Sequence, residues 1–231
     1  MSKQYEHIFF DLDRTLWHFD ENSKQVLSSI YHFFELNNHI LTVDQFMNDY
    51  QQINEELWAK YRNGEIEKEE LRSERFHQTL IKHKVNSFKL AEQIGDYYLE
   101  HSPLQKTLLP HTIAVLNYLK DKYQLHIITN GFEETQLIKL KHSGLTNYFN
   151  QVVFSEKVGV KKPHPLIFKQ AVKSAGANFT NSIMIGDDYY ADICGAQRVN
   201  MDSIYFNFYA LEHPHKIDKE ITCLSELYNI L

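Results

Sequence analysis

Hydrophobic and polar positions divide the chain into a helical front part and a back part in which short strands alternate with helices. His7 to Phe10 is a short apolar run that ends at polar Asp11, which is typical of a buried strand. From about Asn22 to Ser102 the pattern is helical. One helix there carries an apolar stripe with steps of three and four residues, made of Phe46, Tyr50, Ile53, Leu57 and Tyr61. Two more helices are expected, roughly at Lys68–Lys84 and Phe88–Glu100.

After Pro110 the rhythm changes to short alternating elements. Strands are predicted at Gln124–Ile128, Gln151–Phe154, Ser182–Ile185 and Ser203–Phe206. Helices are predicted at about 111–122, 133–143, 165–175 and 190–199. Strands that alternate with helices of this length indicate βαβ units. The expected fold is therefore α/β, a doubly wound, Rossmann-like parallel sheet built from residues 1–16 and 104–231, with an all-helical insertion at 17–103.

Composition narrows the class of protein. The chain has 231 residues, 43% of them hydrophobic, and a net charge of −6. A mildly acidic protein without a basic run is a poor candidate for binding a nucleic-acid polymer. Because the sequence contains no apolar stretch of about 20 residues and no apolar run typical of a signal peptide near Met1, we expect neither a membrane span nor a signal peptide. With only Cys194 and Cys223 and no C-x-x-C spacing, we expect a cytoplasmic protein without disulfides or structural zinc.

Four polar clusters each come shortly after a predicted strand. They are the segment from Asp11 to Thr15, Thr129-Asn130-Gly131, Lys161-Lys162-Pro163, and the segment from Gly186 through Asp187 and Asp188 to Asp192. Loops at the carboxyl ends of parallel strands share one edge of the sheet, where ligands bind. We therefore expect four segments that are distant in sequence to meet at one site.

The residue types at this site point to phosphate chemistry. Asp11 and Asp13 are two positions apart, so in extended backbone their side chains point the same way, and Asp187 adds a third carboxylate. Oxygen ligands without suitably spaced His or Cys favour Mg²⁺ over zinc. The Thr129 hydroxyl, the N–H groups around Asn130 and a lysine ammonium could cradle an anion. A metal and a lysine beside a carboxylate suit phosphoryl transfer.

The chain contains, in this order, the motifs hhhhDxDxT, hhTNG, K-P and GDxxxxD, in which h is a hydrophobic residue and x is any residue. Together they resemble the motifs of the haloacid dehalogenase superfamily. The resemblance implies that Asp11 is a nucleophile that forms an aspartyl-phosphate, and that Asp13 protonates the leaving oxygen and then activates water. It implies that Thr129 and Lys162 hold the phosphoryl group, with Lys162 preferred over Lys161 because it directly precedes proline. Mg²⁺ ligands would be Asp11, the Asp13 backbone carbonyl and Asp187, with Asp192 and Thr15 in supporting positions. Asp13 argues against dehalogenation, because halide needs no proton to leave.

The insertion at 17–103 has the size and position of the helical cap found in this superfamily. Parts of it look like the pyrimidine 5′-nucleotidase branch, namely Tyr50 to Trp58, Tyr61, Gly64 to Ile66, Leu71-Arg72 and Arg75-Phe76. The segment Ile128 to Phe132, with Gln136 and Leu140 after it, looks like the same branch. This implies a phosphatase for nucleoside 5′-monophosphates. The insertion holds 9 basic and 15 acidic residues and so carries the whole net charge of −6, which favours a small phosphomonoester as partner over a polyanion.

Other interpretations remain open. A sugar-phosphate phosphatase or phosphomutase would use the same core with a different cap. A non-catalytic phospho-ligand-binding protein would have no need to keep both Asp11 and Asp13. A response-regulator receiver has no insertion of this length between the motifs. The sequence assigns no role to Arg14 and leaves the oligomeric state open. Asp188 is not expected to be a direct metal ligand.

Overall fold

The computed structural model describes residues 5–231 and divides into two compact units. The first unit runs up to Phe19 and resumes from Lys106 to Leu231, and the second covers Asp20–Gln105. The unit boundaries fall two to three residues after those expected from the sequence. Each unit has its own hydrophobic core, so each is described by itself.

The first unit is built on a six-stranded sheet in which every neighbouring pair is parallel, with the order β3-β2-β1-β4-β5-β6. The strands are β1 (His7–Phe10), β2 (Gln124–Thr129), β3 (Gln151–Phe154), β4 (Ser182–Gly186), β5 (Asp202–Phe206) and β6 (Glu220–Ile221). β1 is central and pairs with both β2 and β4. All four of its residues are buried, which explains why it reads as a continuous apolar run rather than an alternating one.

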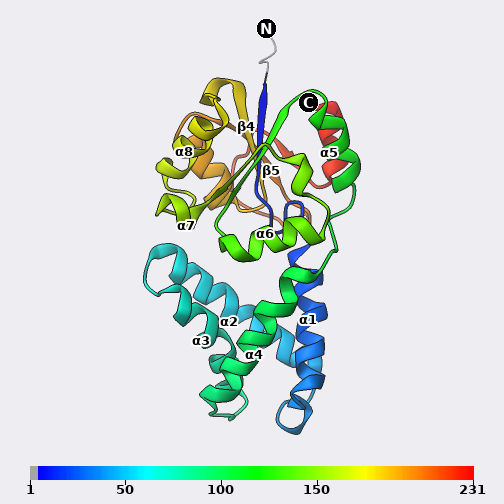
Figure 1. Ribbon diagram of the computed structural model, residues 1–231, viewed down its shortest axis with the longest axis vertical. Helices are drawn as coiled ribbons and strands as arrows, with labels where there is room; N and C mark the ends of the chain where they lie inside the picture. The colour runs from blue at the N-terminus through cyan, green and yellow to red at the C-terminus, as the bar shows by residue number, and fades with distance from the viewer. Residues whose placement is uncertain (1–4) are drawn as a thin grey trace. The chain divides into compact units, whose positions relative to one another are not determined.

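Helices cover both faces of this sheet, as a doubly wound fold requires (Figure 1). The helices are α5 (Thr112–Lys120), α6 (Glu133–His142), α7 (Ser155–Val158), α8 (Pro165–Ala175) and α9 (Gly195–Gln197). Phe10 of β1 packs in the same core as Leu116 of α5, whereas its neighbour Phe9 packs with Phe168 of α8. Successive strand residues thus supply the two cores alternately. The predicted α/β fold is confirmed.

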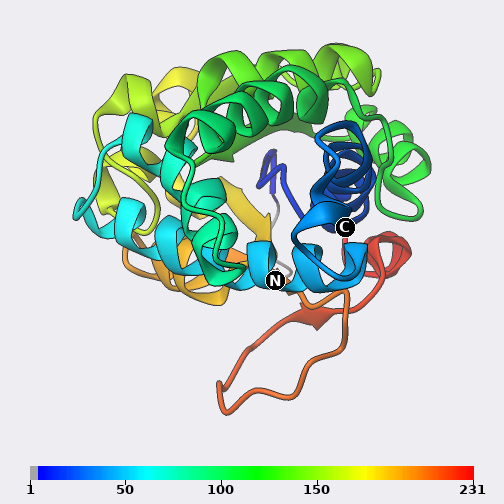
Figure 2. The same cartoon turned by 90° about the horizontal axis from the view of Figure 1, so that it is seen from below.

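Two predicted details of this unit were wrong. The helix expected at 190–199 is a π-helical turn, Tyr189–Cys194, followed by the short α9. The Asp188 carboxylate caps this turn by accepting the N–H groups of Tyr190 and Ala191 at 2.9 and 2.8 Å, a local choice that apolar periodicity does not reveal. Strand β6 was also missed, because two residues are too short for a pattern. The long loop that precedes it, orange to red in Figure 2, extends away from the sheet.

The second unit is built from four α-helices, α1 (Phe19–Phe33), α2 (Val43–Asn63), α3 (Lys68–Lys82) and α4 (Phe88–His101), with short 3-10 helices at Leu36–Asn38 and Ser102–Leu104. The hydroxyls of Thr42 and Ser87 cap α2 and α4 by accepting backbone N–H groups one turn into each helix. The apolar stripe from Phe46 to Tyr61 is buried along α2, as its spacing predicts. None of the helices in residues 5–231 has the length and apolar character needed to cross a bilayer.

A histidine lies inside the sheet of the first unit. His126 of β2 is fully buried, stacks on Phe9 with ring centroids 4.7 Å apart, and its Nε2 lies 3.1 Å from His7 Nδ1. Burial and the neighbouring His7 lower the pKa of His126 to about 4. The folded protein therefore holds this ring in its neutral form at pH values where the unfolded chain protonates it.

This burial predicts a loss of stability in acid. Between pH 6.5 and 4 the unfolded state binds a proton at His126 that the folded state does not, so the free energy of unfolding falls as pH decreases. The contribution of this ring between pH 7 and pH 5 is about 2 kcal/mol. Urea unfolding at both pH values should show that His126→Gln is less sensitive to acid than the unchanged protein by this amount. Equal pH dependence of the two proteins would contradict the assignment.

Candidate active site

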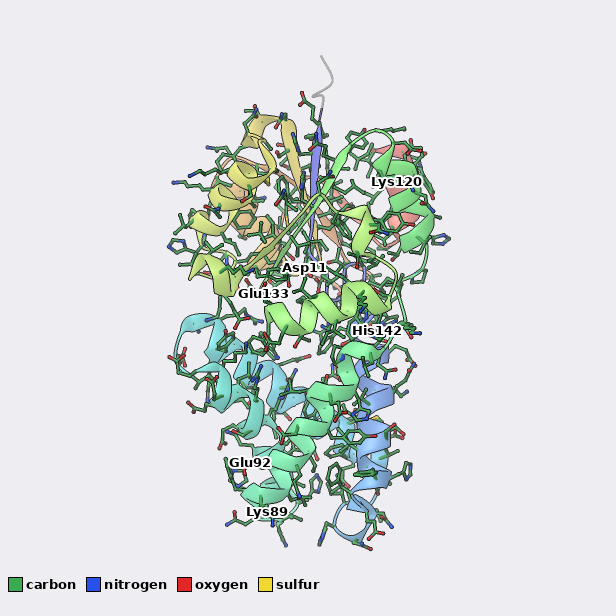
Figure 3. All side chains as sticks on the ribbon, in the orientation of Figure 1. Asp11, Lys89, Glu92, Lys120, Glu133 and His142 are labelled. Atoms are coloured by element: carbon green, nitrogen blue, oxygen red, sulfur yellow. The ribbon has the colours of Figure 1, made fainter. Side chains whose placement is uncertain are left out.

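The chain turns sharply where β1 ends, and this turn places two carboxylates. Asp11 continues the pairing with β4, because its N–H donates to Ile185 O at 2.9 Å. The carbonyl of Leu12 then accepts the N–H groups of both Leu16 and Trp17 at 2.9 Å, which closes the turn. Asp11 is buried at the carboxyl end of β1, where it is labelled in Figure 3.

Lys162, from the loop between α7 and α8, is buried among groups from three other segments. Its Nζ lies 2.5 Å from Asp11 Oδ1, 2.6 Å from Asp192 Oδ1, and donates to the Ile128 carbonyl of β2 at 2.8 Å. Burial alone would lower the pKa of Lys162, but the two carboxylates outweigh it and raise that pKa above its ordinary value. Lys162 is therefore a permanent cation at the end of the sheet.

The Asn130 side chain fixes the loop that carries Lys162. Its Oδ1 accepts the Lys162 N–H at 2.8 Å, and its Nδ2 donates to the Lys162 carbonyl at 3.1 Å. This reciprocal pair joins the end of β2 to a segment more than thirty residues away in the chain. The side-chain amide of Asn130 therefore binds protein backbone, so this residue can offer an anion only its backbone N–H.

Three carboxylates meet beside Lys162. Asp11, Asp187 and Asp192 each bring one oxygen to within 4.8 Å of the others. Asp192 reaches the end of β4 because Gly186 has no side chain there: a Cβ at Gly186 would lie 2.2 Å from Asp192 Oδ2. Thr15 donates its hydroxyl hydrogen to Asp187 Oδ1 at 3.1 Å and so fixes the third carboxylate.

The three carboxylates of this cluster repel one another. Burial, opposed by Lys162 and reinforced by Asp192, raises the pKa of Asp11 to about 7. Burial and the nearby charges of Asp11 and Asp192 also hold the pKa of Asp187 well above its usual range. The three carboxylates repel one another when they are ionised, and a divalent cation among their oxygens would offset that repulsion. The donor set, all oxygen, is the kind that Mg²⁺ takes.

Asp13 has a different set of partners from Asp11. Its Oδ1 accepts from Lys139 Nζ at 2.5 Å, and its Oδ2 accepts from Gln136 Nε2 at 2.7 Å. The same Gln136 nitrogen lies 2.9 Å from Thr129 Oγ1, and that oxygen also accepts the Gly131 N–H at 3.0 Å. Asp13 and Thr129 are thus joined through helix α6.

The structure brings most of the expected residues to one end of the sheet. Lys162 contacts the carboxylates of Asp11 and Asp192. Asp188 points into the turn that it caps and lies outside the carboxylate group. Arg14 adopts left-handed backbone with φ of 61° and places its guanidinium 4.8 Å from the centroid of the Phe19 ring. Its charge partly opposes the rise in the pKa of Asp187.

Sequence reasoning missed Lys139, and it noted Gln136 only through resemblance. Both residues are buried on α6, three positions apart, which places them on the same face of the helix. A signal was present, since positions 136, 139 and 140 line one face of a helix that follows the Thr129 segment. From sequence alone, however, a lysine on a helix is expected to be exposed to solvent, because its partner carboxylate is not known.

Comparison with known proteins agrees with this geometry. A family model described as haloacid dehalogenase-like hydrolase matches residues 5–200. The chain is 32% identical over 231 residues to "Pyrimidine 5'-nucleotidase YjjG" of Escherichia coli, covering 99% of this chain and 98% of that protein. It is 38% identical over 123 residues, about half of each chain, to a "Glyceraldehyde 3-phosphate phosphatase" of Pyrococcus furiosus.

A solved structure shares the fold over the whole length. The putative HAD-hydrolase YfnB from Bacillus subtilis, described as bound to magnesium with interdomain movement, has a TM-score of 0.88 and 27% identity, and the match covers 99% of both chains. With a family match over most of its length, a full-length relative above 30% identity and this shared fold, the chain belongs to the haloacid dehalogenase-like hydrolase family and is a hydrolytic enzyme.

Proposed function

We propose that this enzyme is a Mg²⁺-dependent phosphomonoesterase that acts through an aspartyl-phosphate on Asp11, with pyrimidine nucleoside 5′-monophosphates as its substrates. One observation supports this more than any other. Buried Lys162 holds Asp11 at the carboxyl end of β1, beside two further carboxylates, in a chain that matches a pyrimidine 5′-nucleotidase from end to end.

The proposed metal ligands are Asp11 and Asp187, together with the backbone carbonyl of Asp13. The mutual repulsion of the buried carboxylates, together with their all-oxygen donor set, supports a Mg²⁺ site here. Bound Mg²⁺ would neutralise phosphate charge and orient the phosphoryl group. Asp192 contacts Lys162 with one oxygen and accepts the Asp188 N–H at 3.1 Å with the other, so we assign it the supporting role of holding Lys162.

In the first half of the reaction, a carboxylate oxygen of Asp11 attacks phosphorus. The bond between phosphorus and the ester oxygen breaks, and its electron pair goes to that oxygen. The Asp13 carboxyl transfers its proton there, so that an alcohol leaves and Asp13 becomes a carboxylate. Lys162 and the Thr129 hydroxyl, with the N–H groups of the turn at Asn130, hold the phosphoryl oxygens and the charge that develops on them.

In the second half, water hydrolyses the aspartyl-phosphate. The Asp13 carboxylate takes a proton from water as the water oxygen attacks phosphorus. The bond between phosphorus and the Asp11 oxygen breaks, and its electrons restore the Asp11 carboxylate. Inorganic phosphate is released and Asp13 is again protonated, ready for the next ester.

The second unit is the proposed cap that excludes water from the reaction. Its position as an all-helical insertion between Asp13 and Thr129 supports this, as does the interdomain movement described for the Bacillus subtilis protein. Its acidic balance favours small substrates over polyanions. Both cysteines are free, in keeping with the proposed cytoplasmic location.

A sugar-phosphate or glyceraldehyde-phosphate phosphatase is the second candidate. It is favoured by the 38% identity to the Pyrococcus furiosus enzyme, which exceeds that to the nucleotidase but extends over about half of the chain. The nucleotidase likeness covers almost every residue, including those of the helical unit, and therefore carries more weight for the substrate.

Replacement of the proposed nucleophile gives the first test. Asp11→Asn keeps the shape of the side chain and its contact with Lys162, and it removes one of three repelling charges, so the protein should remain folded. Hydrolysis should fall at least about a thousandfold, because an amide cannot form the phosphoryl ester. Phosphate release and circular dichroism measure the two effects, with Asp121→Asn on the exposed surface as control. Full activity in folded Asp11→Asn would exclude the nucleophile.

A substrate panel gives the second test. Phosphate release should require Mg²⁺, stop with a chelator and return when Mg²⁺ is restored. The values of kcat/KM for uridine and thymidine 5′-monophosphate should exceed those for glucose 6-phosphate and glyceraldehyde 3-phosphate by at least about tenfold, the selectivity that a few base contacts provide. Preference for glyceraldehyde 3-phosphate would favour the second candidate. No release from any ester would leave a phospho-ligand-binding protein.

A further inference from the structure

Helix α6 crosses the carboxyl end of the sheet and presents two side chains to Asp13. In Figure 3 it runs between the labelled Glu133 and His142, close to the labelled Asp11. Gln136 and Lys139 both point from it toward the Asp13 carboxylate and each contacts a different oxygen. Both oxygens of the Asp13 carboxylate are therefore held by side chains of one helix.

Lys139 is built into the protein rather than extended into solvent. Its side chain is 5% exposed, and its ammonium lies 4.2 Å from the centroid of the Trp17 ring and 5.7 Å from that of Phe19. Among the described residues, Asp13 is the one carboxylate within ion-pair distance of Lys139. Burying a lysine ammonium costs free energy unless an opposite charge lies beside it, and at this position Asp13 supplies that charge.

The second contact ties Asp13 to the anion-binding turn. Gln136 Nε2 lies between Asp13 Oδ2 and Thr129 Oγ1. It can approach the turn because residue 131 is glycine: a Cβ there would lie 1.9 Å from Gln136 Nε2. The proposed proton donor and the proposed phosphoryl-binding hydroxyl thus share a single amide, which sets their separation.

We propose that Lys139 is a positioning residue for the leaving-group step, which fixes the Asp13 carboxyl where it protonates the departing ester oxygen. This inference rests on the proposed function. Lys139 does not itself touch the substrate. It holds Oδ1, Gln136 holds Oδ2, and each oxygen keeps a second lone pair on which Asp13 can carry the transferred proton. A displacement of about 1 Å of such a group can cost about a hundredfold in rate.

Replacing Lys139 should slow the hydrolysis of some phosphate esters more than that of others. Lys139→Met keeps the length and the apolar contact with Trp17 but removes the ammonium. Nucleoside monophosphates release an alkoxide that needs a proton, whereas p-nitrophenyl phosphate releases a phenolate that does not. We expect kcat/KM for thymidine 5′-monophosphate to fall about a hundredfold and that for p-nitrophenyl phosphate less than about fivefold. The parameter compared is kcat/KM because it reports only the steps up to departure of the alcohol or phenol.

Matched variants separate positioning from folding. Lys141→Met, an exposed lysine on the same helix, should leave both substrates unchanged. Lys139→Arg should recover at least tenfold of the loss on thymidine 5′-monophosphate, because it restores a cation against Asp13. In a protein that already carries Asp13→Asn, the further change Lys139→Met should lower kcat/KM for thymidine 5′-monophosphate by less than about threefold, because the carboxyl group that Lys139 positions is gone. Circular dichroism and thermal melting check each variant, and Lys139→Gln replaces Lys139→Met under the same criteria if the latter does not fold.

The outcomes are distinct. No hydrolysis of either ester by the unchanged protein would reject the proposed function itself. Activity in the unchanged protein, with equal losses on both esters in the Lys139 variant, would reject positioning and leave a general structural role. An undiminished rate on thymidine 5′-monophosphate would reject any role in this step. A selective loss on the alkyl ester, rescued by arginine, supports the inference.

Discussion

The ion pairs of Lys162 are the interaction on which the rest of the site depends. One buried ammonium contacts carboxylates that follow β1 and β4 and a carbonyl of β2, while its own loop follows β3. Removing that charge would leave Asp11 and Asp192 facing each other in a buried setting, next to Asp187. Two neighbouring residues make these ion pairs possible. Asn130 fixes the lysine loop, and Gly186 gives Asp192 room to reach the end of β4.

The two acids of the first motif are separated by their surroundings, although they are only two residues apart. Asp11 lies in the cluster of like charges, where burial raises its pKa and a cation would be needed to balance it. Asp13 lies outside that cluster, between an amide and an ammonium from α6. The tight turn at Leu12 makes this division possible, because it sends the two side chains to different partners. Such a division is what a reaction with one nucleophile and one proton donor requires.

Much of the fold follows from local rules. Short apolar runs bounded by polar clusters predict the strands, and their alternation with helices predicts a parallel sheet whose carboxyl edge collects the motifs. The stripe on α2 predicts its buried face. Local rules failed at Tyr189–Cys194, where a side-chain cap at Asp188 and a wider helical turn replace the expected α-helix. They also failed at β6, which exists only because β5 offers two residues an edge to pair with.

Sequence by itself determined most of the elements and their order, and the group of motif residues that includes Asp11, Asp13, Thr129, Lys162 and Asp187, because spacing and residue type are local properties. Only the tertiary structure decided which of these residues share partners. It assigned Asp188 to a helix cap, the Asn130 amide to the lysine loop, and Lys139 to Asp13. A buried lysine and a surface lysine look the same in a sequence, since what distinguishes them is a carboxylate 126 residues away in the chain.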